Sequence, residues 1–220
     1  MISMIMFADL ENNLPKKIIR TRKRPNVSGI DYDYVKKIGG KMSGKVCVME
    51  GKSKTGQKRV STAIGNLTES ITFGYTRARF KKNAPIVPKV GNKKYPKVFQ
   101  SLRQISQQLF PTYGWDCVSI NHNQECKPHK DKNNQGESII VGFGHYTGGK
   151  LNIEGNSYDI RYKPIKFDGK SLTHFVEPFE GDRWTAVFYK STNYQRVDDS
   201  LKILNTNETD IINGVVSIKM

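Results

Sequence analysis

The chain has 220 residues, 36% of them hydrophobic, which is enough for one sizeable domain with its own core. Its 36 Lys and Arg against 20 Asp and Glu give a formal net charge of +16, which favours a polyanionic partner such as nucleic acid over a merely solvated basic surface. No run approaches the roughly 20 apolar residues of a membrane-spanning helix, so we expect no membrane partner.

The first 30 residues are expected to form a basic, flexible arm, because a dense block of like charges repels itself. The cations of this block are Lys16, Lys17, Arg20, Arg22, Lys23 and Arg24. Residues 15–25 could act as a nuclear-import signal or bind phosphates; a solvated tail is the alternative.

The N-terminus lacks the basic region of a signal peptide, and three cysteines without CxxC spacing indicate reduced thiols. An intracellular protein, nuclear or cytoplasmic, is therefore expected.

Residues 69–82 (ESITFGYTRARFKK) alternate apolar and polar side chains, which is typical of a strand. The cations of this segment are Arg77, Arg79, Lys81 and Lys82, and its aromatic residues are Phe73, Tyr75 and Phe80. Interleaved cations and aromatic rings suit an unstacked nucleic-acid strand, whereas an edge strand protected by Lys and Arg would have the same pattern. Residues 46–63 have a mixed pattern that predicts neither a helix nor a strand.

The clearest helix is predicted over residues 95–111, between Pro96 and Pro111, and we expect it to pack against a sheet. Residues 115–190 then read as short strands separated by Gly, Asn, Asp or Pro. The predicted fold is mainly β with flanking helices (α+β), a double-stranded β-helix or jelly roll with an N-terminal helix packed on the sheet. The jelly-roll domain is expected over 31–196, with its motif core at 115–190. The polar tail, 197–220, could add an edge strand.

A His-x-Asp pair, His129 and Asp131, lies in the middle of the chain. In an extended segment, residues two apart point to the same face, so both can reach one ion. An Fe(II) facial triad needs one further histidine. His174, in a later predicted strand, fits best, and His122 and His145 are the alternatives. Alone, the His-x-Asp pattern is weak evidence.

Arg183 follows His174 by nine residues, after a turn that contains Pro178 and Gly181. If the two strands form a hairpin-like pair, Arg183 lies beside His174 in the same barrel mouth. A planar guanidinium there suits a carboxylate, and Thr185, on the same face, offers a hydroxyl. A surface cation after a turn is the alternative.

Taken together, the His-x-Asp pair, the distant His, the following Arg and the Gly-Gly-x-Leu at 148–151 resemble the 2-oxoglutarate/Fe(II)-dependent dioxygenases. The resemblance covers residues 68 to 190 and is greatest to the TET/JBP branch, the 5-methylcytosine and thymine oxidases, including viral and protist members. Asn134 completes the HxDxxN pattern of that branch. AlkB-like enzymes carry a second Arg six residues after the first, where this chain has Tyr189.

The resemblance implies that His129, Asp131 and His174 hold Fe(II) and that O2 and 2-oxoglutarate are cosubstrates, with ascorbate as a stimulant. It implies that Arg183, assisted by Thr185, binds the distal carboxylate of 2-oxoglutarate. Asn134 would contact the target base. Asn121, on the strand that leads into the site, is expected to bind the other end of the cosubstrate, and Gly148 and Gly149 to let two strands bend past each other.

Three functions are compatible with these patterns. A nucleic-acid base oxidase, acting on DNA rather than RNA and working as a monomer, accounts for the charge and needs a pocket for an extruded base. A prolyl or lysyl hydroxylase would keep the same ligands without needing the charge. A non-catalytic jelly-roll binding module is disfavoured, since all three ligands and Arg183 are present together.

Overall fold

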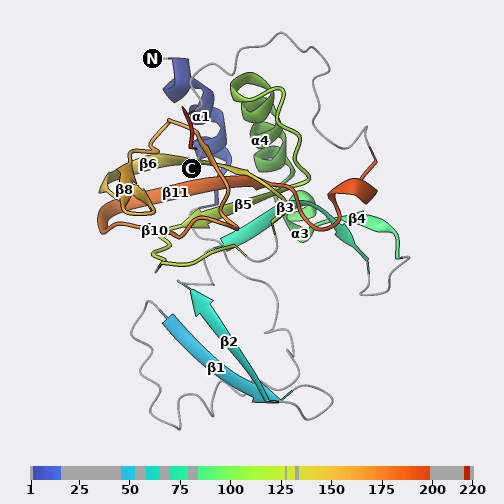
Figure 1. Ribbon diagram of the computed structural model, residues 1–220. Helices are drawn as coiled ribbons and strands as arrows, with labels where there is room; N and C mark the ends of the chain where they lie inside the picture. Colours follow the sequence, from blue (N-terminus) through green and yellow to red (C-terminus); the bar gives the residue numbers. More distant parts are fainter. Residues whose placement is uncertain are drawn as a thin grey trace.

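The computed structural model of the protein describes residues 2–15, 46–52, 58–64, 70–78, 84–126, 128–131, 134–198 and 216–218. These residues form mostly antiparallel β-sheets with few helices (Figure 1). The basic block at residues 16–24, and Arg79, Lys81 and Lys82, lie outside the described residues, so their predicted contacts stay predictions. Within the described part of the chain, every helix is too short or too polar to cross a membrane.

The main sheet has seven strands and is built around two long antiparallel neighbours, which pair from Phe179 opposite Gly148 to Phe188 opposite Ile139. Its order is β12 (Val216–Ser217), β9 (Ile165–Phe167), β6 (Ser138–Gly148), β11 (Phe179–Tyr189), β5 (Cys117–His122), β3 (Ser70–Arg77) and β4 (Ile86–Pro88). The pairing of β12 with β9 is parallel.

A smaller sheet has the order β10 (His174–Val176), β7 (Leu151–Ile153) and β8 (Asn156–Tyr158). The predicted hairpin-like pairing of the His174 and Arg183 strands is wrong, because β10 pairs with β7 whereas β11 pairs with β5 and β6. The chain changes sheets at Glu177 and Pro178 instead of turning back on itself. Separately, β1 (Val46–Lys52) and β2 (Lys58–Ile64) form an antiparallel hairpin.

Helices α1 (Ile2–Asn13) and α4 (Pro96–Leu109) lie on the same side of the main sheet (Figure 1). Helix α4 begins at Pro96, whose fixed φ suits a first helical turn, and buries an apolar stripe that includes Val98, Leu102 and Ile105. The prediction of a helix packed on the sheet is confirmed here. Two short helices complete the described elements, α3 (Val90–Lys94) and a 3-10 turn at Tyr194–Arg196.

Successive side chains of β11 point alternately to the two sides of the main sheet. Trp184, Ala186 and Phe188 belong to the large core beneath α1 and α4. Val187 faces the other way and packs on a second cluster formed by the inner faces of both sheets. Because side chains two apart share a face, Arg183 and Thr185 also point between the two sheets.

Two expectations about the first eighty residues need correction. Residues 2–13, placed in a flexible arm, form helix α1, whose Phe7 and Leu10 are fully buried. Strand β3 is an interior strand between β5 and β4, and its Phe73 and Tyr75 are buried, so these two rings are not a surface for stacking bases.

Candidate active site

His129, Asp131 and His174 lie together, with their metal-binding atoms within 4.8 Å of one another. His129 and His174 face each other across a bridge in which each backbone N–H donates to the other's carbonyl at 3.0 Å. The two Nε2 atoms approach different oxygens of Asp131, at 3.8 Å for His129 and 3.9 Å for His174. Two imidazoles and one carboxylate in this arrangement could hold a divalent transition metal.

The imidazole of His174 is held in one tautomer by the backbone. Its Nδ1 lies 3.0 Å from the carbonyl oxygen of Leu172, and a carbonyl only accepts, so Nδ1 carries the proton. The Nε2 lone pair is then left for a metal. Burial lowers the pKa of His174, which keeps the ring neutral and able to act as a ligand.

Asp131 is held by hydrogen bonds to two neighbours, Gly169 and Asn134. Its backbone N–H donates to the carbonyl of Gly169 at 2.8 Å, and its Oδ2 accepts from the Asn134 amide at 2.9 Å. A Cβ at Gly169 would lie 3.1 Å from Asp131 Oδ2 and 3.3 Å from His174 Cε1, so any side chain there would crowd two of the three ligands. In the sequence, Gly169 follows Asp168 and reads simply as part of a turn, so nothing in the pattern pointed to the site.

Asn134 therefore points its amide nitrogen inward, where it also donates to the Ser138 hydroxyl at 3.1 Å. The contact with a target base stays a prediction. What the described residues show is a side chain that donates a hydrogen bond to the Asp131 carboxylate and orients it.

Arg183 lies in the interior between the sheets, with 2% of its surface exposed. Its Nε donates to the carbonyl of Gly149 at 3.2 Å, while Nη2 is buried without a hydrogen-bond partner among the described residues. The guanidinium carbon lies 5.4 Å from the ring centre of Tyr146 and 5.3 Å from that of Phe179. Burial lowers the pKa of Arg183, but a guanidinium titrates far above neutrality and remains charged. A buried cation with an unused N–H is suited to an anionic ligand.

The Gly-Gly pair makes room for this arginine. Gly149 has a φ of +64° and accepts no Cβ, since that atom would lie 2.7 Å from Arg183 Nε. The interpretation of this pair as a strand bend is thus incomplete, because Gly149 also supplies the space and the carbonyl that position the guanidinium.

The two halves of the site face the same cluster of buried side chains. The His174 ring lies 5.0 Å from the ring of Phe167, which belongs to the cluster between the two sheets toward which Arg183 also points. Both halves also influence the thiol of Cys126. Burial raises the pKa of Cys126 to about 11; the Arg183 guanidinium opposes this increase, and the Asp131 carboxylate adds to it. The two halves of the site therefore share the interior on one side of the main sheet, although their strands belong to different sheets.

Thr185 and Asn121 are neighbours in the register of β11 and β5. The Asn121 amide donates to the Thr185 hydroxyl at 3.3 Å and accepts from the Ser70 hydroxyl at 2.8 Å. Their cosubstrate contacts stay predictions, and the described interactions join them to each other.

The alternative histidines lie elsewhere. His122 stacks on Trp184 at 3.9 Å between ring centres and pairs with the Asp182 carboxylate, and it occupies the face of β5 that turns toward the helices. His145 is exposed on β6. Neither belongs to the group of potential metal ligands found in the described part of the chain.

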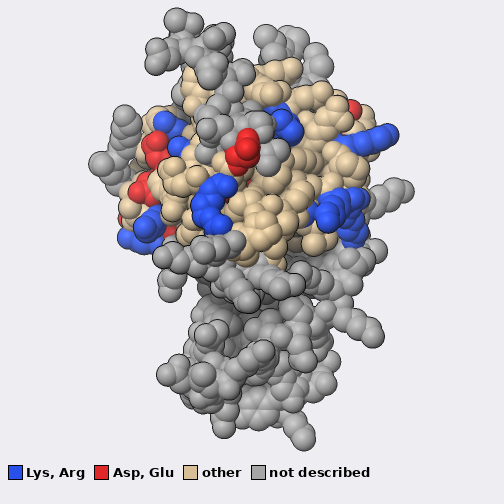
Figure 2. All heavy atoms as spheres, turned by 90° about the vertical axis from the view of Figure 1, so that its right-hand side faces the viewer, with Lys and Arg blue, Asp and Glu red and all other residues tan. Residues whose placement is uncertain are grey.

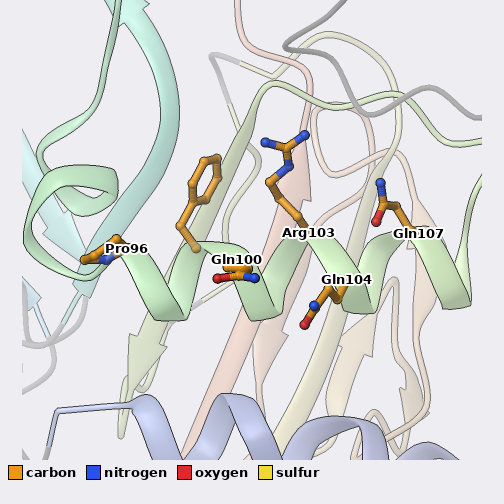
Figure 3. A pocket seen from close by; sticks show the side chains of 6 residues that line it. Pro96, Gln100, Arg103, Gln104 and Gln107 are labelled. Carbon is orange, nitrogen blue, oxygen red and sulfur yellow. The ribbon is translucent and has the colours of Figure 1, made fainter.

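A shallow groove of about 290 Å³ lies along α4 and is separate from this site (Figure 3). It is lined by Pro96, Phe99, Gln100, Arg103, Gln104 and Gln107. Of the four cations predicted in residues 69–82 to contact nucleic acid, the structure describes Arg77, which lies at the end of β3 and is half-buried.

No protein-family model matches the sequence, and no curated protein matches it. Among solved structures, the chain is similar to NgTET1 in complex with 5mC DNA, with 12% sequence identity, a TM-score of 0.41, and coverage of 75% of this chain and 70% of that chain. It is also similar to the Escherichia coli ribosomal oxygenase YcfD, with 12% identity, a TM-score of 0.29, and coverage of 76% and 45%. At these scores, neither similarity assigns a function to this chain.

Proposed function

We propose that the protein is an Fe(II)- and 2-oxoglutarate-dependent dioxygenase whose strands form a double-stranded β-helix. The observation that carries the proposal is the pairing of a His-Asp-His group with a buried arginine whose Nη2 has no partner among the described residues. The donor set fits Fe(II), because two imidazoles and one carboxylate leave coordination positions open. The unpaired guanidinium fits a carboxylate.

His129, Asp131 and His174 would hold the iron, and Arg183 would bind the distal carboxylate of 2-oxoglutarate. When bound, the metal and cosubstrate supply the oxidative chemistry that places one oxygen atom of O2 in a C–H bond of the substrate, with succinate and CO2 as coproducts. The chain's own residues orient and shield these groups. Leu172 fixes the His174 tautomer, Asn134 holds Asp131, and Tyr146 and Phe179 keep water from the Arg183 guanidinium.

We further propose that the substrate is the methyl group of a nucleic-acid base, thymine or 5-methylcytosine, in DNA. The distribution of charge supports a polyanionic partner. Residues 16–97 contain 22 Lys and Arg and 4 Asp and Glu, a net +18, whereas residues 98–220 contain 14 of each. Such a segregation of charge along the sequence favours a partner that carries phosphates.

The structure describes some of the cations in residues 16–97. Lys89, Lys93 and Lys97 lie at α3 and at the start of α4, where Lys93 and Lys97 are exposed. Figure 2 views the side of the molecule on which β4 lies in Figure 1, and Lys and Arg side chains project there at several places around an uncharged area, with some Asp and Glu side chains among them. Cations that project at several places on one side could contact the phosphates of a nucleic-acid backbone.

The test is to incubate the purified protein with Fe(II), 2-oxoglutarate, ascorbate and duplex DNA that contains thymine and 5-methylcytosine. Succinate and the digested nucleosides are then measured by mass spectrometry. We expect succinate and a hydroxylated base with the wild type, and neither with His174→Ala. His145→Ala, which removes an exposed histidine, should behave as the wild type.

Succinate production by His174→Ala at the wild-type rate would refute the assignment of the metal centre. Succinate without any modified nucleoside would refute the substrate instead, and hydroxylated prolyl or lysyl peptides under the same conditions would identify a protein hydroxylase.

A further inference from the structure

Two buried polar atoms on neighbouring strands lack hydrogen-bond partners among the described residues, Nη2 of Arg183 on β11 and the hydroxyl oxygen of Tyr146 on β6. Tyr146 is 5% exposed and Arg183 is 2% exposed. The Tyr146 ring lies 5.4 Å from the guanidinium carbon of Arg183. The two groups are close enough for each to affect the pKa of the other, but neither atom makes a hydrogen bond of good geometry among the described residues. A buried hydroxyl or N–H left without such a bond costs roughly 1–3 kcal/mol, so the pair points to a missing polar ligand.

Glycines leave space beside both groups. A Cβ at Gly142 would lie 2.5 Å from the Tyr146 hydroxyl oxygen, and one at Gly149 would lie 2.7 Å from Arg183 Nε. Gly142 stands in β6 opposite Thr185, so the strand that carries Tyr146 has no side chain where its hydroxyl turns inward. Any larger residue at either position would displace the polar group beside it.

Both groups are hydrogen-bond donors. Burial raises the pKa of Tyr146 by more than the nearby Arg183 guanidinium lowers it, so the hydroxyl keeps its proton at neutral pH. Arg183 is charged. An O–H and an N–H donor side by side match the two oxygens of one carboxylate. The hydroxyl of Thr185 already has one partner, because it accepts from the Asn121 amide, whereas the hydroxyl of Tyr146 has none among the described residues.

We propose that Tyr146 is the second anchor of the cosubstrate, donating its hydroxyl hydrogen to the distal carboxylate that Arg183 also binds. The inference rests on the proposed dioxygenase function and changes one detail of it. The hydroxyl that assists Arg183 comes from β6, from a residue that the sequence pattern did not single out, instead of from Thr185.

The test is a direct binding measurement on the full chain, by titration calorimetry with 2-oxoglutarate under anaerobic conditions with Mn(II) in place of iron. Tyr146→Phe keeps the ring against Arg183 and removes only the O–H, so the dissociation constant should rise about tenfold or more. Tyr162→Phe is the matched control, because its hydroxyl donates to Glu11 beneath α1, and it should bind as the wild type. Thr185→Val should weaken binding less than Tyr146→Phe.

Two further measurements make the assignment specific. With 2-oxopentanoate, which lacks the distal carboxylate, the wild type and Tyr146→Phe should bind equally weakly. Gly142→Ala should weaken 2-oxoglutarate binding in the wild type but add little in Tyr146→Phe, since the methyl group then has no hydroxyl to displace.

If folded Tyr146→Phe binds 2-oxoglutarate as tightly as the wild type, or if Thr185→Val loses more affinity, the role of Tyr146 is overturned while the dioxygenase proposal stands. If the wild type itself binds no 2-oxoglutarate in the presence of Mn(II), both proposals fail.

Discussion

Asn134 stands three residues beyond the carboxylate ligand that it contacts, and its two predicted roles can be separated by experiment. Asn134→Ala removes the hydrogen bond to Asp131 Oδ2 and leaves that carboxylate free to rotate. Because such outer contacts orient metal ligands, we expect Mn(II) affinity to fall about tenfold, measured by electron paramagnetic resonance titration. Gln135→Ala, at the exposed neighbouring position, should leave the affinity unchanged.

The opposite result is equally informative. If Asn134→Ala binds Mn(II) like the wild type but no longer oxidises the base, the residue contacts the substrate and does not position Asp131.

At the scale of residues, spacing predicted that His129 and Asp131 act together, while the choice of His174 over His122 and His145 depended on the family resemblance. His129 and Asp131 share a face in an extended segment, and His174 occupies a separate strand that pairs back to His129. The burial of Arg183 was also foreseeable, because an isolated cation in the apolar strand RWTAVFY has few other places to go. Tyr146 and Gly169 were not predicted, because their places depend on which strands pair and on how the two sheets pack, and no local pattern encodes either.

Helix α1 is the element on which the sequence prediction failed most clearly. Its first residues, ISMIMF, are apolar except for Ser3 and lack the spacing of one helical face, and the adjoining basic block favoured an extended arm. Its structure depends on tertiary contacts. Phe7 lies 5.5 Å from the rings of both Phe143 and Tyr162, and Glu11 accepts from the backbone N–H of Gly144 and the hydroxyl of Tyr162.

By contrast, local sequence correctly predicted helix α4 and the strands between residues 115 and 190. Pro96 and an apolar stripe define the helix, and Gly, Asn or Pro separates the strands. Which strands pair could not be predicted from local sequence. Strand β10, for example, has only three residues, and its pairing with β7 is set by the packing of the small sheet.

The packing of α1 can be tested through stability. Phe7→Ala should lower the free energy of unfolding by about 3–5 kcal/mol, because it removes a fully buried ring that contacts two others. Asn12→Ala, on the exposed side of the same helix, should change it by less than about 0.5 kcal/mol. Urea denaturation followed by tryptophan fluorescence measures both. Equal stability of Phe7→Ala and the wild type would show that α1 does not dock on the sheet in solution.

The molecule as a whole separates its charge from its candidate chemistry. The triad and Arg183 lie within residues 98–220, where acidic and basic residues balance, while the excess of cations lies in residues 16–97. This division implies that binding to a polyanion and turnover of the cosubstrate depend on different side chains. Truncation of the N-terminus cannot test it, because removing the basic block from that end also removes the buried Phe7 and Leu10.

Substitutions on the described surface provide the test. A variant with Lys89, Lys93 and Lys97 replaced by Gln should bind DNA more weakly, and by a similar factor for all sequences, because interactions with phosphates carry no sequence information. In a plot of log binding constant against log salt concentration, the slope should become shallower by up to about 2.7, since each phosphate that the protein no longer neutralises reduces it by about 0.9. The same change of charge at the exposed Lys150, Lys163 and Lys170 is the control and should leave the slope nearly unchanged. Both variants should keep the wild-type rate of succinate formation in the absence of DNA, since neither set includes a residue of the site. An equal loss of affinity from the two sets would mean that DNA responds to the total charge of the protein, and the surface at α3 and α4 would then have no particular role.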